Sequence, residues 1–398
     1  MKQTYVVGGA VRDALLGLPV HDRDYVVVGS SPAQMLAEGY QAVGKDFPVF
    51  LHPHSHAEYA LARTERKTAA GYQGFVFHTD PSVTLEQDLI RRDLSINAMA
   101  QDEDGQLYDP YGGQRDLQLR MFRHVSPAFA EDPVRILRVA RFAARFSLPP
   151  HDFTVAPETT ALMRSMVEAG EVDALMPERV WQELARGLME AKPSRMFEVL
   201  RSAGALARIL PELDALWGVP QAPQHHPESD TGIHVMLCID YAAARNFPLP
   251  VRFAALLHDL GKASLVEQVC RRLKVPGECR DLAFMTAREL GHLGRVFSMC
   301  SSDIVDLLVR NDGLRKPQRF LELLRAAECA QCGRAGIAQQ DFPAAVVWQQ
   351  ALHAVQQVDG AAIARLCVEQ QKSIPEALRK ARIAAVQHLE NQVLKQEN

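Results

Sequence analysis

The chain has 398 residues, of which 47% are hydrophobic and 23% charged, a balance typical of ordinary globular proteins. No run approaches the ~18 uninterrupted apolar residues of a membrane span, and no apolar segment with a cleavage site opens the chain, so we expect a cytoplasmic protein. The length predicts two or three domains, and the formal net charge of −4 disfavours a uniformly basic nucleic-acid binder.

Basic residues are nevertheless clustered. Residues 121–150 hold five arginines against Glu131 and Asp132, and residues 371–385 hold a second group of lysines and arginines against Glu376. Local basic surfaces therefore remain compatible with a nucleic-acid partner. The seven cysteines are an odd number scattered over the second half, which predicts reduced thiols. Cys329 and Cys332 form one C-x-x-C, for which we favour packing over metal binding.

Up to about residue 115, short β-branched and aromatic runs alternate with helical patterns, which predicts an α/β domain. The segment SPAQMLAEGY (31–40) opens with a capping serine and a proline and predicts a helix. From about residue 130 onward the apolar residues recur at helical spacing, as in 131–146, 177–190, 251–263 and 317–330. The sequence thus predicts an α/β head followed by an all-α neck, body and tail.

The Pro- and His-rich stretch 219–232 has no periodicity and is the clearest internal boundary. We expect a head over residues 1–140, a helical neck and body over 141–225, a third helical domain over 226–330 and a helical tail over 331–398.

A glycine pair, an arginine and two aspartates lie close together near the amino terminus, in VVGGAVRDALLGLPVHDRDYVVVG (6–29). Gly8 and Gly9 follow a predicted strand, and Arg12 follows in the first turn of a predicted helix, where glycine backbone and guanidinium suit phosphate groups. Asp22 and Asp24 are two residues apart at a strand start, about 6.6 Å from each other on one face. Such carboxylates favour Mg²⁺, although a D-x-D alone is often a solvated strand end.

In EDPVRILRVARFAAR (131–145), four arginines fall within about 120° of one helix face. They are Arg135, Arg138, Arg141 and Arg145. They either hold anions and nucleotide or are neutralised by counterions and acids from elsewhere. Asp132 and Arg135, three residues apart on one helix, offer an acceptor beside a fork of donors.

These motifs resemble the DNA polymerase β-like nucleotidyltransferases, in the class II branch of bacterial CCA-adding enzymes and poly(A) polymerases. Three later segments match the same family in the same order: RRDLSINAMA (91–100), LYDPYGGQRDL (107–117) and residues 131–145. The amino-acid sequence is most similar to the gamma-proteobacterial type of CCA-adding enzyme, with a partial HD domain. The resemblance implies template-independent addition of CCA to the 3′ end of tRNA from CTP and ATP, by two-metal transfer with Mg²⁺ on Asp22 and Asp24.

The same resemblance implies roles for further residues. Asp132 and Arg135 would read the base with Glu131 in support, and Arg92 and Asp93 would lie beside sugar and phosphates, although Asp93 also suits a helix cap. Glu65 would be an extra carboxylate near the metals. The implied nucleotide-binding set is Gly9, Arg12, Arg92, Asp132, Arg135, Arg138 and Arg141.

His258 and Asp259 in AALLHDLGKA resemble the signature of HD phosphohydrolases, whose helices present histidines and aspartates to divalent metals, with His234 as the upstream ligand. Only Ala263 and Ser264 follow Lys262 before the next helical pattern, so the middle histidines of that signature are absent. Packing and capping roles are the alternative, and the short ligand set argues against phosphatase or phosphodiesterase activity.

Three rival functions stay open. A poly(A) polymerase shares the head motifs, although the chain ends at LKQEN without a strongly basic extension. An HD-type phosphohydrolase with an RNA-binding head, and a non-catalytic RNA-binding protein, both conflict with the intact glycine, arginine and aspartate motif.

Overall fold

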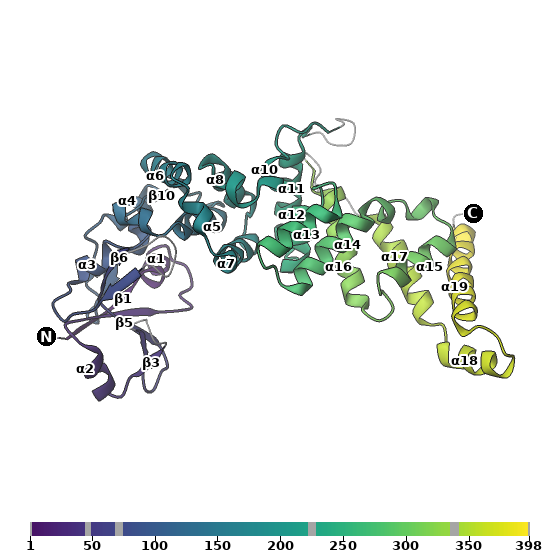
Figure 1. Ribbon diagram of the computed structural model, residues 1–398, viewed down its shortest axis with the longest axis horizontal. Helices are drawn as coiled ribbons and strands as arrows, with labels where there is room; N and C mark the ends of the chain where they lie inside the picture. The colour runs from purple at the N-terminus through teal and green to yellow at the C-terminus, as the bar shows by residue number, and fades with distance from the viewer. Residues whose placement is uncertain (1, 44–48, 68–74, 222–227, 335–341, 397–398) are drawn as a thin grey trace. The chain divides into compact units, whose positions relative to one another are not determined.

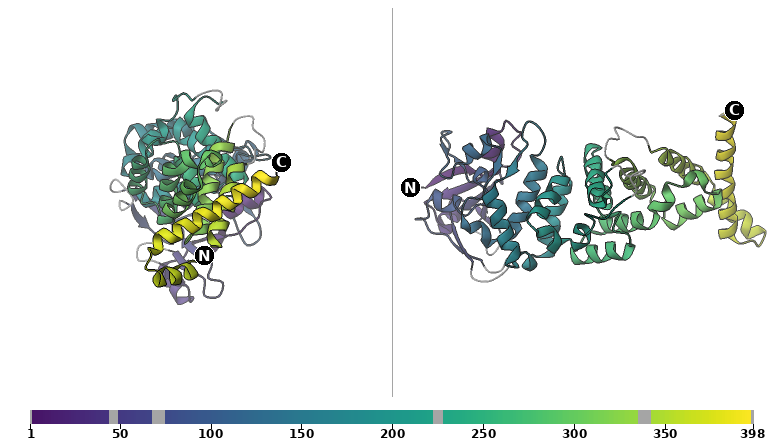
Figure 2. Two further views of the ribbon diagram at one scale, coloured as in Figure 1. Left: turned by 90° about the vertical axis from the view of Figure 1, so that its right-hand side faces the viewer. Right: turned by 90° about the horizontal axis from the view of Figure 1, so that it is seen from above.

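The structure is a computed structural model that describes residues 2–43, 49–67, 75–221, 228–334 and 342–396 (Figure 1). It divides into two compact units, Met1–Ile209 and Leu210–Asn398. Within the described ranges every β-strand lies in the first unit, and helices build the second (Figure 2). The predicted α/β head followed by helical regions is confirmed. None of the described helices is both long and apolar enough to cross a membrane.

A mixed seven-stranded sheet forms the head, in the order β3-β4-β5-β2-β1-β8-β9. Strands β1 (Gln3–Val7) and β2 (Asp24–Val28) pair antiparallel with Val7 opposite Asp24, and β2 pairs parallel with β5 (Glu58–Leu61). The outer strands are β3 (Gln41–Val43), β4 (Val49–Leu51), β8 (Ala100–Gln101) and β9 (Leu107–Tyr108). Two separate pairs join β6 (Thr64–Lys67) to β7 (Phe75–His78) and β10 (Met121–Phe122) to β11 (Thr154–Val155).

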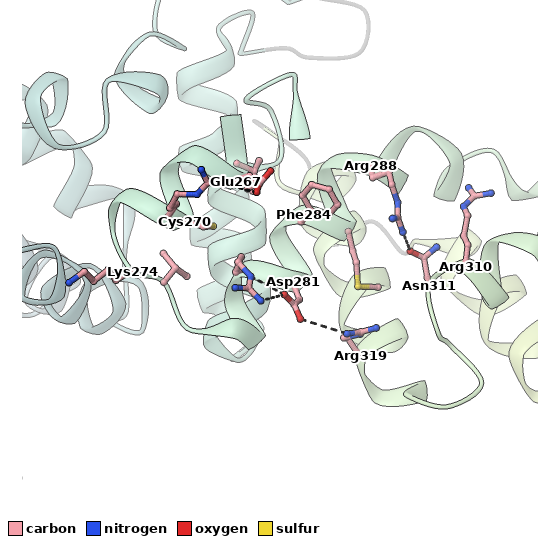
Figure 3. Close-up of a pocket in the computed structure, with 14 residues that line it drawn as sticks. Glu267, Cys270, Lys274, Asp281, Phe284, Arg288, Arg310, Asn311 and Arg319 are labelled. Carbon is pink, nitrogen blue, oxygen red and sulfur yellow. Dashed lines mark hydrogen bonds and ion pairs between the residues drawn. The ribbon is translucent and has the colours of Figure 1, made fainter. Parts of the chain in front are cut away.

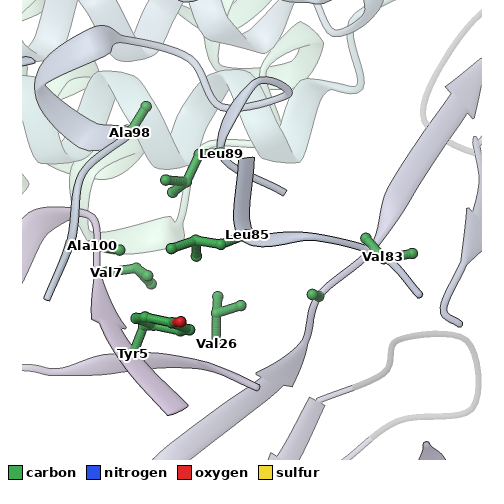
Figure 4. Close-up of a cluster of buried hydrophobic side chains, with 9 residues drawn as sticks. Tyr5, Val7, Val26, Val83, Leu85, Leu89, Ala98 and Ala100 are labelled. Carbon is green, nitrogen blue, oxygen red and sulfur yellow. The ribbon is translucent and has the colours of Figure 1, made fainter. Parts of the chain in front are cut away.

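A buried apolar cluster connects the sheet to helix α3 (Leu85–Leu89), as Figure 4 shows. Tyr5 and Val7 are two residues apart on β1 and face the same side, where they meet Val26 and Leu85. Ala98 and Ala100 complete the cluster from the chain that follows the 3₁₀ turn η2 (Ser95–Asn97). The cluster therefore fixes the end of β1, which leads into Gly8 and Gly9, beside the segment that carries Asp93 and Asn97.

The first helices follow from local sequence signals. Gly8 has φ 70°, a conformation that suits glycine, and helix α1 (Gly9–Leu15) begins directly after it. Helix α2 (Pro32–Ala37) confirms the predicted helix in 31–40. The Ser31 hydroxyl accepts from the Gln34 N–H at 3.3 Å, the Gln34 side chain accepts from the Ser31 N–H at 2.9 Å, and Pro32 opens the helix.

Helices complete the first unit after the sheet. They are α4 (Gly113–Gln118), α5 (Val134–Arg145), α6 (Pro157–Glu168), α7 (Pro177–Leu188), α8 (Ser194–Ser202) and α9 (Ala205–Ile209), with 3₁₀ turns η3 (Pro127–Glu131) and η4 (Glu171–Ala174). Helix α5 packs against α7 and α8 and buries Ile136, Leu137, Val139 and Ala140 completely. Its opposite, arginine-bearing side is consequently turned away from that core.

The second unit is a run of helices: α10 (Pro211–Asp214), α11 (Thr231–Ala244), α12 (Leu249–Leu257), α13 (Ala263–Arg272), α14 (Gly277–Leu293), α15 (Ser301–Arg310), α16 (Pro317–Cys332), α17 (Pro343–Gln356), α18 (Gly360–Glu369) and α19 (Ile374–Gln396). A 3₁₀ turn, η5 (Val296–Ser298), precedes α15. Helix α12 is buried over most of its length and packs against α11, α14 and α16, so it is central to this unit.

Candidate active site

One hollow of about 760 Å³ in the first unit gathers the residues that the sequence singles out. Asp22 and Asp24 line it, and so does every residue of the implied nucleotide-binding set: Gly9, Arg12, Arg92, Asp132, Arg135, Arg138 and Arg141. Of the described side chains around this hollow, ten are arginines and five are carboxylates. Such a positive surplus in a concave site suits a polyanion such as a nucleoside triphosphate.

The two aspartates of the D-x-D lie at the entry to β2. Asp24 is the first residue of the strand and Asp22 precedes it, and both side chains are exposed. No hydrogen bond or ion pair to another described residue holds either carboxylate. Because both carboxylates line one hollow and are not committed to protein partners, they are available to share a divalent cation.

The loop after α3 is anchored by buried carboxylates. Asp88 is fully buried and forms ion pairs with Arg91 at 2.6 Å and with Arg92 at 3.2 Å. Burial by itself would raise the pKa of Asp88, but the charges of Arg91 and Arg92 outweigh it and lower that pKa. This network fixes the direction in which Arg92 reaches the hollow.

Asp93 is buried and accepts from three donors: the Leu94 N–H at 2.9 Å, the Asn97 amide at 3.0 Å and Arg138 Nε at 2.8 Å. Burial raises its pKa, yet Arg138 and the Asn97 amide together hold the pKa of Asp93 well below its usual range. The expected cap is not formed, because Leu94 is the cap residue of the 3₁₀ turn and Asp93 binds the adjacent N–H instead. The carboxylate position next to Arg138 is therefore rigid.

Arg12 is buried at 3% exposure, and its guanidinium lies between protein partners. Its Nε donates to Asp13 at 2.8 Å and its Nη1 to Asn97 Oδ1 at 2.6 Å, while the rings of Phe142 and Phe146 lie 5.1 Å away. Burial lowers the pKa of Arg12, and the Asp13 carboxylate opposes that shift. The guanidinium edge that faces the hollow is thus held in place by one acid, one amide and two rings.

The arginines on α5 are largely paired with acids, which was one of the two expectations for this face. Arg138 binds Asp93, Arg141 binds Glu183 at 2.6 Å, and Arg145 binds Asp13 at 3.0 Å. Arg135 donates to the backbone carbonyls of Ala128 at 2.6 Å and Arg91 at 2.7 Å. All four still line the hollow, so pairing orients these guanidinium groups without withdrawing them from it.

Asp132 does not share a helix with Arg135, and that expectation is wrong. Asp132 is extended (φ −125°, ψ 104°), and α5 begins at Val134. Pro133 favours an extended residue before it, so the helix begins after the proline. The Asp132 carboxylate accepts from both terminal nitrogens of Arg179 on α7, at 3.1 and 2.8 Å. Asp132 is therefore oriented by a neighbouring helix rather than by its own.

Sequence reasoning missed the contribution of α7. Arg179, Gln182, Glu183 and Arg186 line the hollow, and they recur at positions i, i+3, i+4 and i+7 of that helix. This polar stripe was readable in PERVWQELARGLME. Reasoning from motifs also missed Arg63, Arg91 and Asn97, for which no helical pattern gave a signal. The side chain of Glu65 lies outside the described residues.

A second hollow, of about 730 Å³, lies within the second unit between α13, α14, α15 and α16 (Figure 3). Six cations line it, against Glu267 and Asp281 among the described residues: Arg271, Lys274, Arg280, Arg288, Arg310 and Arg319. Arg280 pairs with Asp281 at 2.9 Å, and Arg288 donates to Asn311 at 2.6 Å. Val266, Cys270 and Phe284 also line it, so the hollow combines basic and apolar side chains.

The residues of the HD-like segment also come together. His234 on α11 and His258 at the end of α12 are buried, and their rings lie 5.4 Å apart. Asp259 Oδ2 lies 3.4 Å from His258 Nε2.

Comparison with known proteins places the chain in a family. Residues 4–123 match the family model described as "Poly A polymerase head domain", and residues 152–216 match "Probable RNA and SrmB- binding site of polymerase A". The multifunctional CCA protein of Janthinobacterium sp. (strain Marseille) is 64% identical over 96% of this chain and 97% of that protein. The multifunctional CCA protein of Herminiimonas arsenicoxydans is 61% identical over 98% of each chain.

Solved structures share the fold. The CCA-adding enzyme of Bacillus stearothermophilus in complex with CTP has a TM-score of 0.67 and 23% identity over 97% of this chain and 89% of that one. The Thermotoga maritima CCA-adding enzyme in complex with tRNA has a TM-score of 0.65 and 20% identity over 98% and 92%. Members of the nucleotidyltransferase family use a divalent metal. On the strength of its near-full-length relatives, this chain belongs to the family of CCA-adding tRNA nucleotidyltransferases.

Proposed function

We propose that this chain adds CCA to the 3′ end of tRNA, taking CTP and ATP without a nucleic-acid template. The observation that carries the proposal is one hollow that joins Asp22 and Asp24, two carboxylates without a partner among the described residues, to an arginine-rich wall that includes Asp132. In each step the tRNA 3′-oxygen forms a bond to the α-phosphorus of the nucleotide, the bond to the β-phosphate oxygen breaks, and pyrophosphate and a proton leave. Because the reaction needs tRNA and both nucleotides together, we propose that it takes place in the cytoplasm.

Asp22 and Asp24 would hold Mg²⁺, because carboxylate and phosphate oxygens are the ligands that this hard cation prefers. When bound, the metal lowers the pKa of the attacking hydroxyl and neutralises charge on the leaving pyrophosphate. The protein's own task is to orient the reactants. Arg92, held by Asp88, and Arg138, held by Asp93, present guanidinium groups at fixed positions for the triphosphate.

Base selection would depend on Asp132. Its two oxygens offer about four acceptor positions, and the fork from Arg179 uses two of them, so acceptor capacity remains for an exocyclic amino group. Cytosine and adenine both carry such a group, whereas uracil presents a carbonyl at that edge. Arg135, held by two backbone carbonyls, lies in the same hollow as a donor to a ring acceptor.

The basic hollow of the second unit would bind the tRNA backbone. Its six cations match the phosphate contacts that dominate RNA affinity, and its apolar lining residues suit the sugar and base faces between the phosphates. This assigns the helical unit a role in holding the substrate, separate from the chemistry of the head.

The decisive experiment incubates purified protein with tRNA that lacks its 3′ end, supplying each nucleotide singly and in combination. Addition of two C residues from CTP, followed by one A when ATP is present, supports the proposal. An unlimited A tail identifies a poly(A) polymerase and overturns it, and phosphate release without incorporation identifies a phosphohydrolase. An Asp22→Ala variant that adds nucleotides at the wild-type rate would show that the activity belongs to a contaminant.

A further inference from the structure

A buried carboxylate adjoins the basic hollow of the second unit and holds two of its arginines. The side chain of Glu289 on α14 is 1% exposed, whereas those of Arg288 and Arg310, on α14 and α15, are 43% and 44% exposed. Glu289 Oε1 accepts from Arg288 Nε at 2.7 Å and from Arg310 Nε at 3.0 Å, and Glu289 Oε2 accepts from Arg310 Nη2 at 2.6 Å. Because one oxygen binds both Nε atoms, this carboxylate keeps two guanidinium groups next to each other in the lining of the hollow.

Asn311 holds Arg288 from a second side. Asn311 is 2% exposed, and its Nδ2 donates to the Leu307 carbonyl oxygen at 2.9 Å while its Oδ1 accepts from Arg288 Nη2 at 2.6 Å. Figure 3 shows Arg288, Asn311 and Arg310 at one end of the hollow, away from Glu267. The positions of both guanidinium groups are therefore fixed by buried protein groups before any ligand binds.

The charges of these groups leave a positive surplus at this end of the hollow. Two neighbouring guanidinium groups repel each other, and one carboxylate compensates only one of the two charges. Burial alone would raise the pKa of Glu289, but hydrogen bonds from Arg310 and Arg288 outweigh it and lower that pKa, so the carboxylate is charged at neutral pH. Each guanidinium uses two of its five N–H groups in the bonds to Glu289 and Asn311, so donors remain on both. The surplus charge and the remaining donors suit a phosphate group.

We propose that Glu289 is a positioning residue for tRNA, which holds Arg288 and Arg310 ready for one phosphate of the RNA backbone. The inference rests on the proposed function of this hollow, and it extends that function to a residue that does not itself touch RNA. Glu289 carries the same sign of charge as RNA, so by charge alone it would weaken binding. Its effect has the opposite sign because a free arginine side chain loses conformational entropy when it binds phosphate, whereas one that is already held loses less.

The test compares Glu289→Gln with Glu267→Gln in the full-length protein, because both variants remove one negative charge at this hollow. Glu267 lines the hollow and pairs with Arg271 at 2.9 Å, but its side chain is 54% exposed. The Kd for tRNA that lacks its 3′ end is measured without nucleotide, so the chemistry of the head does not enter. We expect this Kd to rise about 5- to 10-fold in Glu289→Gln and to fall about twofold in Glu267→Gln. A Glu289→Gln variant that binds tRNA as tightly as wild type, or more tightly, would overturn the proposal.

A double-mutant cycle with Arg288→Ala separates positioning from a general loss of structure. In Arg288→Ala the Glu289 carboxylate keeps both bonds from Arg310, so no buried charge is left without a partner. If Glu289 acts through the arginines, the loss of tRNA affinity in Glu289→Gln/Arg288→Ala is smaller than the product of the two single losses. The kcat for nucleotide addition at saturating tRNA should stay at the wild-type value in each variant. A combined loss equal to that product, or a lower kcat, would show that Glu289 acts in another way.

The double variant Arg280→Ala/Arg319→Ala, at other positions of the same hollow, distinguishes this inference from the function on which it rests. If that variant binds tRNA as tightly as wild type, the hollow is not the RNA site, and both proposals fail. If it binds tRNA more weakly while Glu289→Gln does not, the hollow remains the RNA site and the inference about Glu289 alone is wrong.

Discussion

Asp93 combines burial with three hydrogen bonds, and the consequence is a dependence of stability on pH. Its pKa in the folded protein lies below the value of about 3.9 in the unfolded chain. A carboxylate with a lowered folded pKa stabilises the fold fully above its unfolded pKa, and this stabilisation is lost as the pH falls toward the folded pKa. The head should therefore be destabilised by acid through this one side chain, below about pH 4.

Replacing Asp93 by Asn tests this directly. The variant keeps the shape but removes the negative charge that faces Arg138, so we expect the free energy of unfolding at neutral pH to fall by about 2–3 kcal/mol. Urea denaturation measures the difference between wild type and variant, and that difference should shrink as the pH falls below about 4. A difference that stays constant over this range would contradict the assignment.

Asp132→Asn is the corresponding change for base selection. The amide keeps the size of the side chain but adds donors, which suit the carbonyl edge of uracil. We expect the ratio of kcat/KM for CTP over UTP to fall about 10- to 100-fold. Arg179→Gln removes the paired hydrogen bonds to Asp132 but leaves the Asp132 carboxylate charged, so it should lower this ratio by a smaller factor. An unchanged ratio in Asp132→Asn would remove this residue from base recognition.

Among the elements, α5 shows where sequence reasoning succeeds and where it ends. Spacing at 3.6 residues predicted the helix and its arginine face, and the capping motif at Ser31 likewise predicted α2. Both signals are local. The partners of the arginines are not, because Arg12 meets Asn97 across 85 residues and Arg141 meets Glu183 across 42. A pattern within one segment carries no information about such contacts.

Helix α4 leaves no room for an added methyl group at Gly113. A Cβ on Gly113 would lie 2.5 Å from the Ser95 carbonyl oxygen and 2.7 Å from Met99 Cγ, on the segment that carries Asn97. Because the backbone oxygen cannot move freely, Gly113→Ala should destabilise the head by about 1–3 kcal/mol and slow nucleotide addition. The control is Gly291→Ala on α14, where the Cβ meets nothing within 4 Å, and it should be neutral or stabilising by up to about 1 kcal/mol. Equal denaturation midpoints for the two variants would refute the prediction.

At the scale of the whole molecule, we propose that the first unit transfers the nucleotide and that the second unit holds the tRNA. If the basic hollow of the second unit holds tRNA, the double variant Arg280→Ala/Arg319→Ala should raise the KM for tRNA about tenfold. The kcat and the KM for CTP should stay unchanged. The affinity for tRNA should also depend less steeply on salt concentration. Arg365→Ala, an exposed arginine of α18 outside the hollow, is the matched control. A loss in kcat, or an unaltered salt dependence, would exclude this hollow as the RNA site.

The sequence predicted the fold class of each region of the chain better than it predicted which residues line each site. GGAVRD, D-x-D and the arginine helix were sufficient to identify the head, because the motif residues are close together in the chain. Arg179 was not identified, because it becomes informative only when packing places α7 beside Asp132. Tertiary packing supplied that information.

The central claim is that Asp22 and Asp24 perform the transfer. Single-turnover addition of CTP to tRNA lacking its 3′ end measures it most directly, in Asp22→Asn, Asp24→Asn and, as control, Asp104→Asn, an exposed carboxylate of the head outside the hollow. We predict rates at least about 10³-fold lower for the first two, with unfolding free energies within about 0.5 kcal/mol of wild type, and no change for the third. Rates within tenfold of wild type in either Asp22→Asn or Asp24→Asn would contradict the account.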